Sequence, residues 1–185
     1  MKIQHLSLVK EWSRKIKIRK PYQYCRQKLS FVFMAIEIYT DGSAKGNPGN
    51  GGYGAILKFK GFEKELSQGY RLTTNNRMEL LAIIVALETI KTAEHKVIVY
   101  SDSKYVVDSV EKGWVFNWEK KGFKDKKNVD LWKRYLKLHP IYKPKFVWVK
   151  GHAGHAENER CDVLAFNAAD GKNLLVDEGY EKSIK

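Results

Sequence analysis

The sequence predicts an α/β fold built on a five-stranded mixed sheet, and two observations support this prediction. Three strand-like segments come first, between about residues 35 and 71. Helical and strand-like segments then alternate to about residue 169. Consecutive strands favour antiparallel pairing and strands separated by helices favour parallel pairing, so the sheet should contain both kinds, with helices packed on it.

The first three strands are separated by glycine-containing segments. The first strand is expected at about residues 35–41, and Tyr53–Lys60 and Phe62–Arg71 are predicted to form a hairpin that turns at Lys60-Gly61. The stretch GSAKGNPGNGGYG, which runs into this hairpin, could be only a flexible connection. Its glycines would, however, let backbone amides approach a ligand closely.

The second half begins with the most apolar helix, predicted at Asn76–Ile90. Its apolar residues lie on nearly all sides, so it should be buried. The short apolar run Val97–Tyr100 is typical of a central parallel strand. Three helices at about 103–112, 114–120 and 129–138, a last strand at Phe146–Val149 and a closing helix at Glu157–Ala169 are expected to follow.

Size and composition narrow the class of protein. A chain of 185 residues with 43% hydrophobic residues is long enough for one domain with a sizeable core. It contains no apolar run of 18 residues, so we expect no membrane association. Its two cysteines, Cys25 and Cys161, lie too far apart in sequence to suggest a disulfide framework. We therefore expect a reducing, cytoplasmic setting and a monomer.

Positive charge is concentrated in two zones. Residues 1–33 hold nine Lys or Arg and one acid, and residues 112–134 hold eight Lys or Arg and three acids. The whole chain has a net charge of +13. Such zones attract polyanions without specifying which one.

Residues 1–33 are expected to stand apart from the folded domain, which we place at 34–185. They have no clean hydrophobic period, and they lack the apolar centre and cleavage site of a secretory signal. We interpret them as a disordered basic arm or as the product of translation upstream of Met34, with less support for an organellar transit peptide.

Four carboxylates, at Asp41, Glu79, Asp102 and Asp162, occupy unusual positions in this scheme. Each has a structural alternative. Asp41-Gly42 could open a turn, and Glu79 could cap the helix from Asn76. Similarly, Asp102 or the neighbouring Ser101 could cap a helix, and Asp162 could be a solvated charge. Taken singly, these alternatives are the simpler interpretations.

Together, the four carboxylates suggest a metal site. If the first and fourth strands are parallel neighbours, Asp41 and Asp102 lie side by side at strand carboxyl ends, where open α/β sheets bind ligands. The two flanking helices can each add one carboxylate. Oxygen ligands without thiolates suit Mg²⁺ or Mn²⁺, and two such ions can catalyse an in-line phosphodiester displacement.

The chain also resembles a known family. The stretches IYTDGSAKGNPGNGGYGAIL, TTNNRMELLAIIVALE, YSDSKYV, NVDLW and WVKGHAGHAENERCDVLA are strongly similar to type I ribonuclease H, especially its bacterial members. The resemblance implies a ribonuclease-H-like fold with helices on both faces of the sheet. It also implies an endonuclease that cuts the RNA strand of RNA–DNA hybrids, leaving 5′-phosphate and 3′-hydroxyl ends. Two Mg²⁺ ions, with Mn²⁺ as a possible substitute, would serve as cofactors.

The resemblance implies roles for individual residues. Asp41, Glu79, Asp102 and Asp162 would hold the metal ions, with Asp41 bridging both. The other implied contacts are with the hybrid: amides for the minor groove (Asn47, Asn75, Asn76), a site for a DNA phosphate (Thr74, Asn158), and a basic protrusion for the DNA strand (Trp114, Trp118, Lys120, Lys121, Lys124, Lys126, Lys127).

Two features depart from the family pattern. The protrusion between Phe123 and Asn128 is several residues shorter than in well-known bacterial members. Leu72 stands where the family often has an arginine, and Arg71 beside it is a candidate substitute. Ordinary core packing is an alternative role for Trp114 and Trp118, which have helical spacing.

His152 lies in the stretch KGHAGH, and the resemblance implies that it carries protons or helps the product to leave. A surface histidine with no function is the simpler alternative. A zinc site formed by His152, His155 and Cys161 is a further one, but no second ligand pair of structural type appears.

We therefore expect a hybrid-specific ribonuclease. Two other functions remain open at this point: a non-catalytic module that binds hybrids, and a related domain that acts on DNA ends or in strand transfer. Absence of a carboxylate would favour the first, and all four are present. The asparagine set and the basic protrusion argue against the second.

Overall fold

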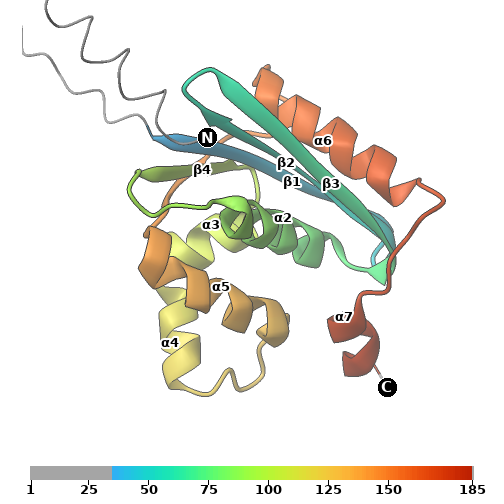
Figure 1. Cartoon of the computed structure of the whole chain (residues 1–185). Coiled ribbons are helices and arrows are strands. Elements are labelled where there is room, and N and C mark those ends of the chain that lie inside the picture. The colour runs from blue at the N-terminus through green and yellow to red at the C-terminus, as the bar shows by residue number, and fades with distance from the viewer. Residues whose placement is uncertain (1–34, 185) are drawn as a thin grey trace, which may run out of the picture. The chain divides into compact units, whose positions relative to one another are not determined.

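A single mixed sheet organises the computed structural model, which describes residues 35–184 (Figure 1). Its strand order is β3-β2-β1-β4-β5. β1 pairs antiparallel with β2 and parallel with β4, β2 pairs antiparallel with β3, and β4 pairs parallel with β5. The predicted five-stranded mixed sheet is confirmed. The strands are β1 (Ile36–Gly46), β2 (Gly49–Phe59), β3 (Phe62–Thr73), β4 (Val97–Ser101) and β5 (Lys145–Trp148).

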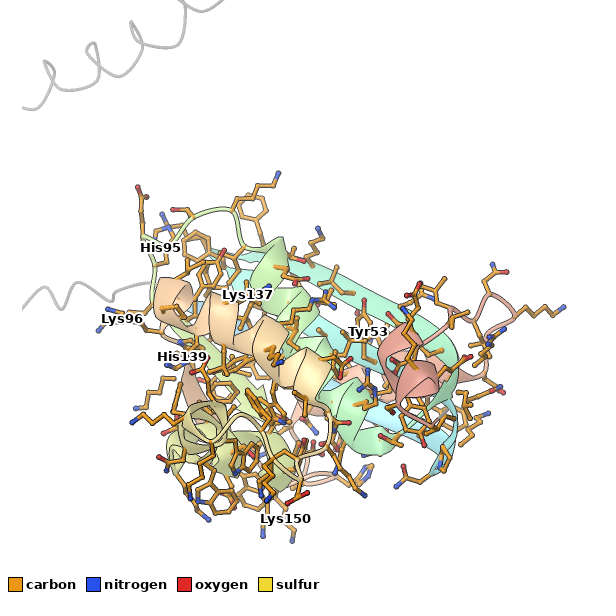
Figure 2. All side chains as sticks on the ribbon, turned by 90° about the horizontal axis from the view of Figure 1, so that it is seen from below. Tyr53, His95, Lys96, Lys137, His139 and Lys150 are labelled. Carbon is orange, nitrogen blue, oxygen red and sulfur yellow. The ribbon has the colours of Figure 1, made fainter. Side chains whose placement is uncertain are left out.

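Helices cover both faces of this sheet, as expected. Figure 1 shows α6 on one face and α2 and α3 on the other, and α6 and α2 each contact both β1 and β2. α5 packs on α2 from the side away from the sheet, and Figure 2 shows it there with Lys137 and His139. The helices are α2 (Asn75–Thr89), α3 (Lys104–Glu111), α4 (Trp114–Lys120), α5 (Val129–Tyr142), α6 (Ala156–Ala169) and α7 (Glu178–Ser183).

The core lies between the sheet and α2. Nine residues of α2 are buried, on nearly every side of the helix, which confirms the predicted buried helix. Ile36 and Ile38 of β1 and Val97 and Val99 of β4 are buried at alternate positions against it. Aromatic side chains of α5, including the fully buried Trp132, close the core from the far side of α2.

The first strand is longer than predicted. β1 continues through Gly42 to Gly46, and β2 begins at Gly49, so most of the glycine-rich stretch is a strand pair and the alternative of a flexible connection is wrong. Glycine disfavours strands locally, and the ladder from Asp41↔Gly54 to Gly46↔Gly49 overrides that preference. α7 was not predicted, and α5 extends to Tyr142 with Pro140 inside it.

Across residues 35–184, every helix is too short or too polar to span a lipid bilayer. The predictions for residues 1–33 lie outside the described residues.

Candidate active site

The carboxyl ends of β1 and β4 bring two of the predicted carboxylates together. Thr40 of β1 pairs with Ser101 of β4 in the parallel ladder. Asp41 and Asp102 are the next residues on the two strands, so they emerge side by side, as the sequence predicted. This edge of the sheet is where open α/β folds place their ligands.

Asp41 is a buried carboxylate in a continuing strand. It is 8% exposed, and the Gly42 amide donates to its Oδ1 at 2.7 Å. Burial, together with the negative charges of Asp102 and Asp162, raises its pKa to about 7. The alternative that Asp41-Gly42 forms a turn is wrong, because both residues pair within the β1–β2 ladder.

Gly42 has a packing role next to Asp41. A Cβ at this position would collide with the backbone of Met78 and Glu79, so only glycine lets α2 approach β1 this closely. The approach carries Glu79 towards Asp41. The close approach of α2 to β1 therefore explains the glycine at this buried position.

Glu79 lies one turn into α2 and faces the same cluster. Asn75 donates from Nδ2 to its Oε1 at 2.7 Å. Burial, together with the charges of Asp41 and Asp102, raises the pKa of Glu79 to about 8. The capping alternative is wrong: Thr74 is the N-cap of α2, and the Glu79 carboxylate bonds to the Asn75 side chain instead.

Asp102 is not the cap of the helix that follows it. Ser103 caps α3, and its side chain accepts a hydrogen bond from the Val106 amide, so the capping alternatives for Asp102 and Ser101 are wrong. The backbone carbonyl of Asp102 accepts a hydrogen bond from Trp148 Nε1 at 3.0 Å.

Asp162 comes from α6 on the other face of the sheet. It is half-buried, and its charge contributes to the raised pKa of Asp41. The neighbouring Cys161 Sγ donates to the Tyr39 carbonyl of β1 at 3.2 Å. A Cβ on Gly54 would collide with the Cys161 carbonyl, so this glycine lets α6 lie close to the sheet. Asp162 therefore lies beside the cluster, and it is not a freely solvated helix charge.

The chemistry of this cluster fits a divalent cation. Within residues 35–184, none of the four carboxylates forms an ion pair with a Lys or Arg side chain. The charges of Asp102 and Asp162 help to raise the pKa of Asp41, and those of Asp41 and Asp102 help to raise the pKa of Glu79, as expected of acids that share a site without a cationic partner. The donors are all oxygens, which Mg²⁺ and Mn²⁺ prefer.

The four carboxylates do not all converge on one position where a single metal ion could bind. In the described part of the chain, no three His, Cys, Asp or Glu side chains lie close enough together to hold one metal ion. Mg²⁺ usually keeps several of its waters and binds only one or two carboxylates directly, so a site of this kind does not need three protein ligands around one ion.

His152 lies on the loop between β5 and α6. It is exposed, and its φ of 51° is in the left-handed region. His155 is the exposed N-cap of α6, whereas Cys161 is fully buried against Tyr39. Of the three ligands of the alternative zinc site, the two histidines are thus exposed to solvent and the cysteine lies in the core.

Several predicted substrate contacts gather beside the cluster. The backbone amide of Asn75 donates a hydrogen bond to Asn47 Oδ1 at 3.3 Å. This bond connects the turn between β1 and β2 to the start of α2. A cavity of about 680 Å³ opens here. Its wall includes Asn47, Thr74, Asn76, Lys126 and Lys127 from the predicted set, and Asn128 and Tyr180, which the sequence did not single out.

The basic protrusion surrounds a second cavity, of about 570 Å³. Trp114 is 43% exposed, whereas Trp118 is half-buried and packs edge-to-face on the core residue Trp132. The alternative role in core packing therefore fits Trp118 better than Trp114. The ammonium group of Lys126 lies over the Trp118 ring. The predicted lysines of the protrusion are all exposed: Lys120, Lys121, Lys124, Lys126 and Lys127.

Asn158 is the predicted contact that lies elsewhere. It is 3% exposed, and its Nδ2 donates to Asp102 Oδ2 at 3.3 Å. Thr74 lines the cavity described above, but Asn158 does not. This burial does not support the expectation that Asn158 holds a DNA phosphate together with Thr74.

An ion-pair network that the sequence did not reveal holds the start of α2. Arg77 donates to Asp177, which precedes α7, and to Asp130 of α5, with both carboxylate oxygens of each acid engaged. Asp177 also accepts from Thr73 Oγ1 at 2.7 Å. Arg71, the candidate substitute for a phosphate-binding arginine, pairs with Glu181 of α7.

Comparison with known proteins places this site in a family. The RNase H family model matches residues 34–170. The ribonuclease H of Desulforamulus reducens is 56% identical over 147 residues, which are 77% of this chain and 92% of that protein. The ribonuclease H of Pectobacterium carotovorum is 56% identical over 151 residues, 79% of this chain and 96% of that protein.

Solved structures agree with the sequence relatives. LC9-RNase H1, a type 1 RNase H with the type 2 active-site motif, has a TM-score of 0.67 at 32% identity and covers 81% of this chain and 80% of its own. LC11-RNase H1, solved in complex with an RNA/DNA hybrid, has a TM-score of 0.55 at 30% identity, covering 73% of this chain and 96% of its own. In sequence and in fold, this chain belongs to the ribonuclease H family, among its bacterial type I members.

Proposed function

We propose that this chain hydrolyses the RNA strand of RNA–DNA hybrids, leaving 5′-phosphate and 3′-hydroxyl ends. The observation that carries the proposal is the gathering of Asp41, Glu79, Asp102 and Asp162 at one edge of the sheet. Asn75 links this cluster to the cavity that Asn47 and Thr74 line, because it bonds to both Glu79 and Asn47. A relative, LC11-RNase H1, has been solved with an RNA/DNA hybrid, which supports the same substrate class here.

The four carboxylates would hold two divalent cations, Mg²⁺ or alternatively Mn²⁺. Asp41 would be the ligand shared by both ions. It is buried, and it lies close enough to Asp102 and Asp162 for their charges to raise its pKa. When bound, such ions would supply activation of the attacking water and stabilisation of the leaving oxygen. Asn75 keeps the Glu79 carboxylate oriented through its hydrogen bond.

His152 is proposed to move protons at the edge of the site or to help the product leave. Its exposed position on the loop before α6 leaves the ring accessible to solvent and substrate. An imidazole can take up and release a proton near neutral pH.

Recognition of the hybrid is divided among three sets of residues. The amides of Asn47, Asn75 and Asn76 can donate to and accept from a ribose 2′-hydroxyl, which distinguishes RNA from DNA. Thr74 would hold a DNA phosphate in the adjoining cavity. The protrusion would contact the DNA strand through Trp114, Trp118, Lys120, Lys121, Lys124, Lys126 and Lys127.

The catalytic domain is proposed to comprise residues 34–185 and to act as a monomer in the cytoplasm, the compartment in which bacteria keep both DNA and RNA. The family match over residues 34–170 supports the domain boundary. Light scattering should give one chain of 21.4 kDa per particle, and a larger mass would contradict the monomer.

A digestion experiment tests the activity directly. End-labelled hybrid, duplex RNA and duplex DNA are incubated side by side with Mg²⁺ or with EDTA. Only the RNA strand of the hybrid should be cut, and only with Mg²⁺; Asp102→Asn should remove nearly all cleavage while hybrid binding survives. A protein that binds the hybrid without cutting it would be the non-catalytic module instead, and cutting of duplex DNA would indicate the strand-transfer class.

A further inference from the structure

The Asn158 side chain has an unusual combination of partners. Its Nδ2 donates to Asp102 Oδ2, but its Oδ1 is buried and has no hydrogen-bond partner among the described residues. The whole residue is 3% exposed. A buried amide oxygen without a partner is unfavourable, so its retention at this place requires an explanation.

The position of Asn158 connects it to two of the four carboxylates. It lies four residues before Asp162 on α6, so the two side chains share one face of the helix. Its amide nitrogen reaches Asp102 at the end of β4. Asn158 therefore joins the α6 side of the cluster to the β4 side.

Asp102 is held from two further directions. Trp148 Nε1 donates to its backbone carbonyl, and the indole ring has the Lys104 ammonium group over it at 5.0 Å. A Cβ on Gly151 would lie 2.6 Å from Asp102 Oδ2, so a larger residue at this position would displace the carboxylate. Only Asn158 bonds to a carboxylate oxygen of Asp102 in the described part of the chain.

We propose that Asn158 is a positioning residue of the cation site. Its Nδ2 orients the Asp102 carboxylate, and its Oδ1 accepts a hydrogen bond from the hydration shell of the cation. This inference rests on the proposed function, and it replaces the DNA-phosphate role that the sequence resemblance implied. Mg²⁺ commonly keeps several of its waters in protein sites, and partners of this kind tune the affinity of the ligands they hold.

Metal affinity without nucleic acid tests the proposal. Mg²⁺ is titrated calorimetrically into the full chain, into Asn158→Ala and into Ser109→Ala. Ser109 is a matched control, because it is also buried and its replacement also removes one side-chain hydrogen bond, to Tyr105 within α3. Asn158→Ala should bind Mg²⁺ about 10- to 100-fold more weakly, and Ser109→Ala should bind as the unaltered protein does.

Cleavage kinetics separate the positioning role from a phosphate-binding role. For Asn158→Ala, the Mg²⁺ concentration that gives half-maximal activity should rise. The KM for hybrid at saturating Mg²⁺ should stay within about twofold, because Asn158 does not touch the substrate. A raised KM with unchanged Mg²⁺ affinity would overturn the proposal in favour of the DNA phosphate. If the unaltered protein failed to cut hybrids, the calorimetric comparison would still decide whether Asn158 acts on the cation.

A measurement on the unaltered protein covers the case in which Asn158→Ala does not fold. The side-chain amide resonances of Asn158 are followed by NMR during a Mg²⁺ titration, with assignment by Asn158→Asp. They should shift as Mg²⁺ binds, whereas those of the exposed Asn117 on α4 should not. An Asn158 amide that does not respond to saturating Mg²⁺ would refute its role at the site.

Discussion

Replacing Asp41 by Asn should make the metal-free protein more stable while nearly abolishing hybrid cleavage. The Asp41 carboxylate is buried and lies near Asp102 and Asp162, and no Lys or Arg within residues 35–184 is paired with it. An Asn side chain keeps an oxygen that can accept the hydrogen bond from the Gly42 amide. The substitution therefore removes an unfavourable charge and leaves the local geometry in place.

The size of the gain follows from the raised pKa. The pKa of Asp41 rises from 3.8 to about 7. At about 1.4 kcal/mol per pH unit, this rise corresponds to roughly 4 kcal/mol when the carboxylate is fully ionised in both states. Removing Asp41 also removes one of the charges that raise the pKa of Glu79, which acts in the same direction.

The sign of the pH dependence follows from the direction of the shift. Below about pH 4, Asp41 is protonated in both the folded and the unfolded state, so its charge has no effect on stability. Between about pH 4 and 7, the unfolded state releases the proton and the folded state retains it, so stability falls as pH rises. The gain from Asp41→Asn should be about 1–2 kcal/mol at pH 5 and about 4 kcal/mol at pH 8.

Urea unfolding in EDTA, followed by circular dichroism at both pH values, measures this gain. Asp108→Asn is the control, because Asp108 is a carboxylate of α3 paired with Lys112; it should change the free energy of unfolding by less than about 1 kcal/mol. Adding Mg²⁺ should stabilise the unaltered protein more than Asp41→Asn, since it binds the folded state at this site. A gain that is absent at pH 8, or equal at both pH values, would show that Asp41 carries no unfavourable charge. Near-normal cleavage by Asp41→Asn would remove it from the metal ligands.

Four other predictions concern the site and its supports. His152→Ala should slow turnover by about 10²- to 10⁴-fold in single-turnover assays without abolishing it; stoichiometric zinc in the purified protein would contradict its role. Arg77→Met should lower the free energy of urea unfolding by about 3–5 kcal/mol, because it leaves the carboxylate of Asp177, 7% exposed, without its cation; a decrease below about 1 kcal/mol would mean that the network is not stabilising. Deleting residues 1–33 should leave folding and kcat unchanged, and loss of hybrid cleavage at physiological salt would show that the domain begins upstream of Met34. Neutralising protrusion lysines should raise KM more than it lowers kcat and reduce the salt slope of hybrid binding by roughly 0.9 for each phosphate that no longer has a lysine partner; an unchanged slope would exclude direct phosphate binding by Lys120, Lys121, Lys124, Lys126 and Lys127.

The sequence alone determined the order of the elements and the positions of the four carboxylates. The buried helix at α2 and the parallel strand β4 were evident because hydrophobic periodicity is a local property of the chain. Asp41 and Asp102 could be placed side by side because they follow two strands predicted to be parallel neighbours. The family resemblance then supplied the chemistry that these positions imply.

Only the tertiary structure decided which alternatives hold at the site. The ladder with β2 keeps Asp41-Gly42 in a strand, and the close approach of α2 explains the glycine. Ser103, and not Asp102, caps α3. Each of these outcomes depends on interactions between segments or on backbone geometry that residue preferences do not specify.

The role of Asn158 and the anchoring of α2 were also beyond the sequence. Asn158 lies 56 residues from Asp102 along the chain, and Arg77 lies 100 residues from Asp177. Local patterns show which residues are polar, but they do not show which polar groups meet after folding. Burial then makes these pairings selective, because a polar group removed from water must find its partner within the fold.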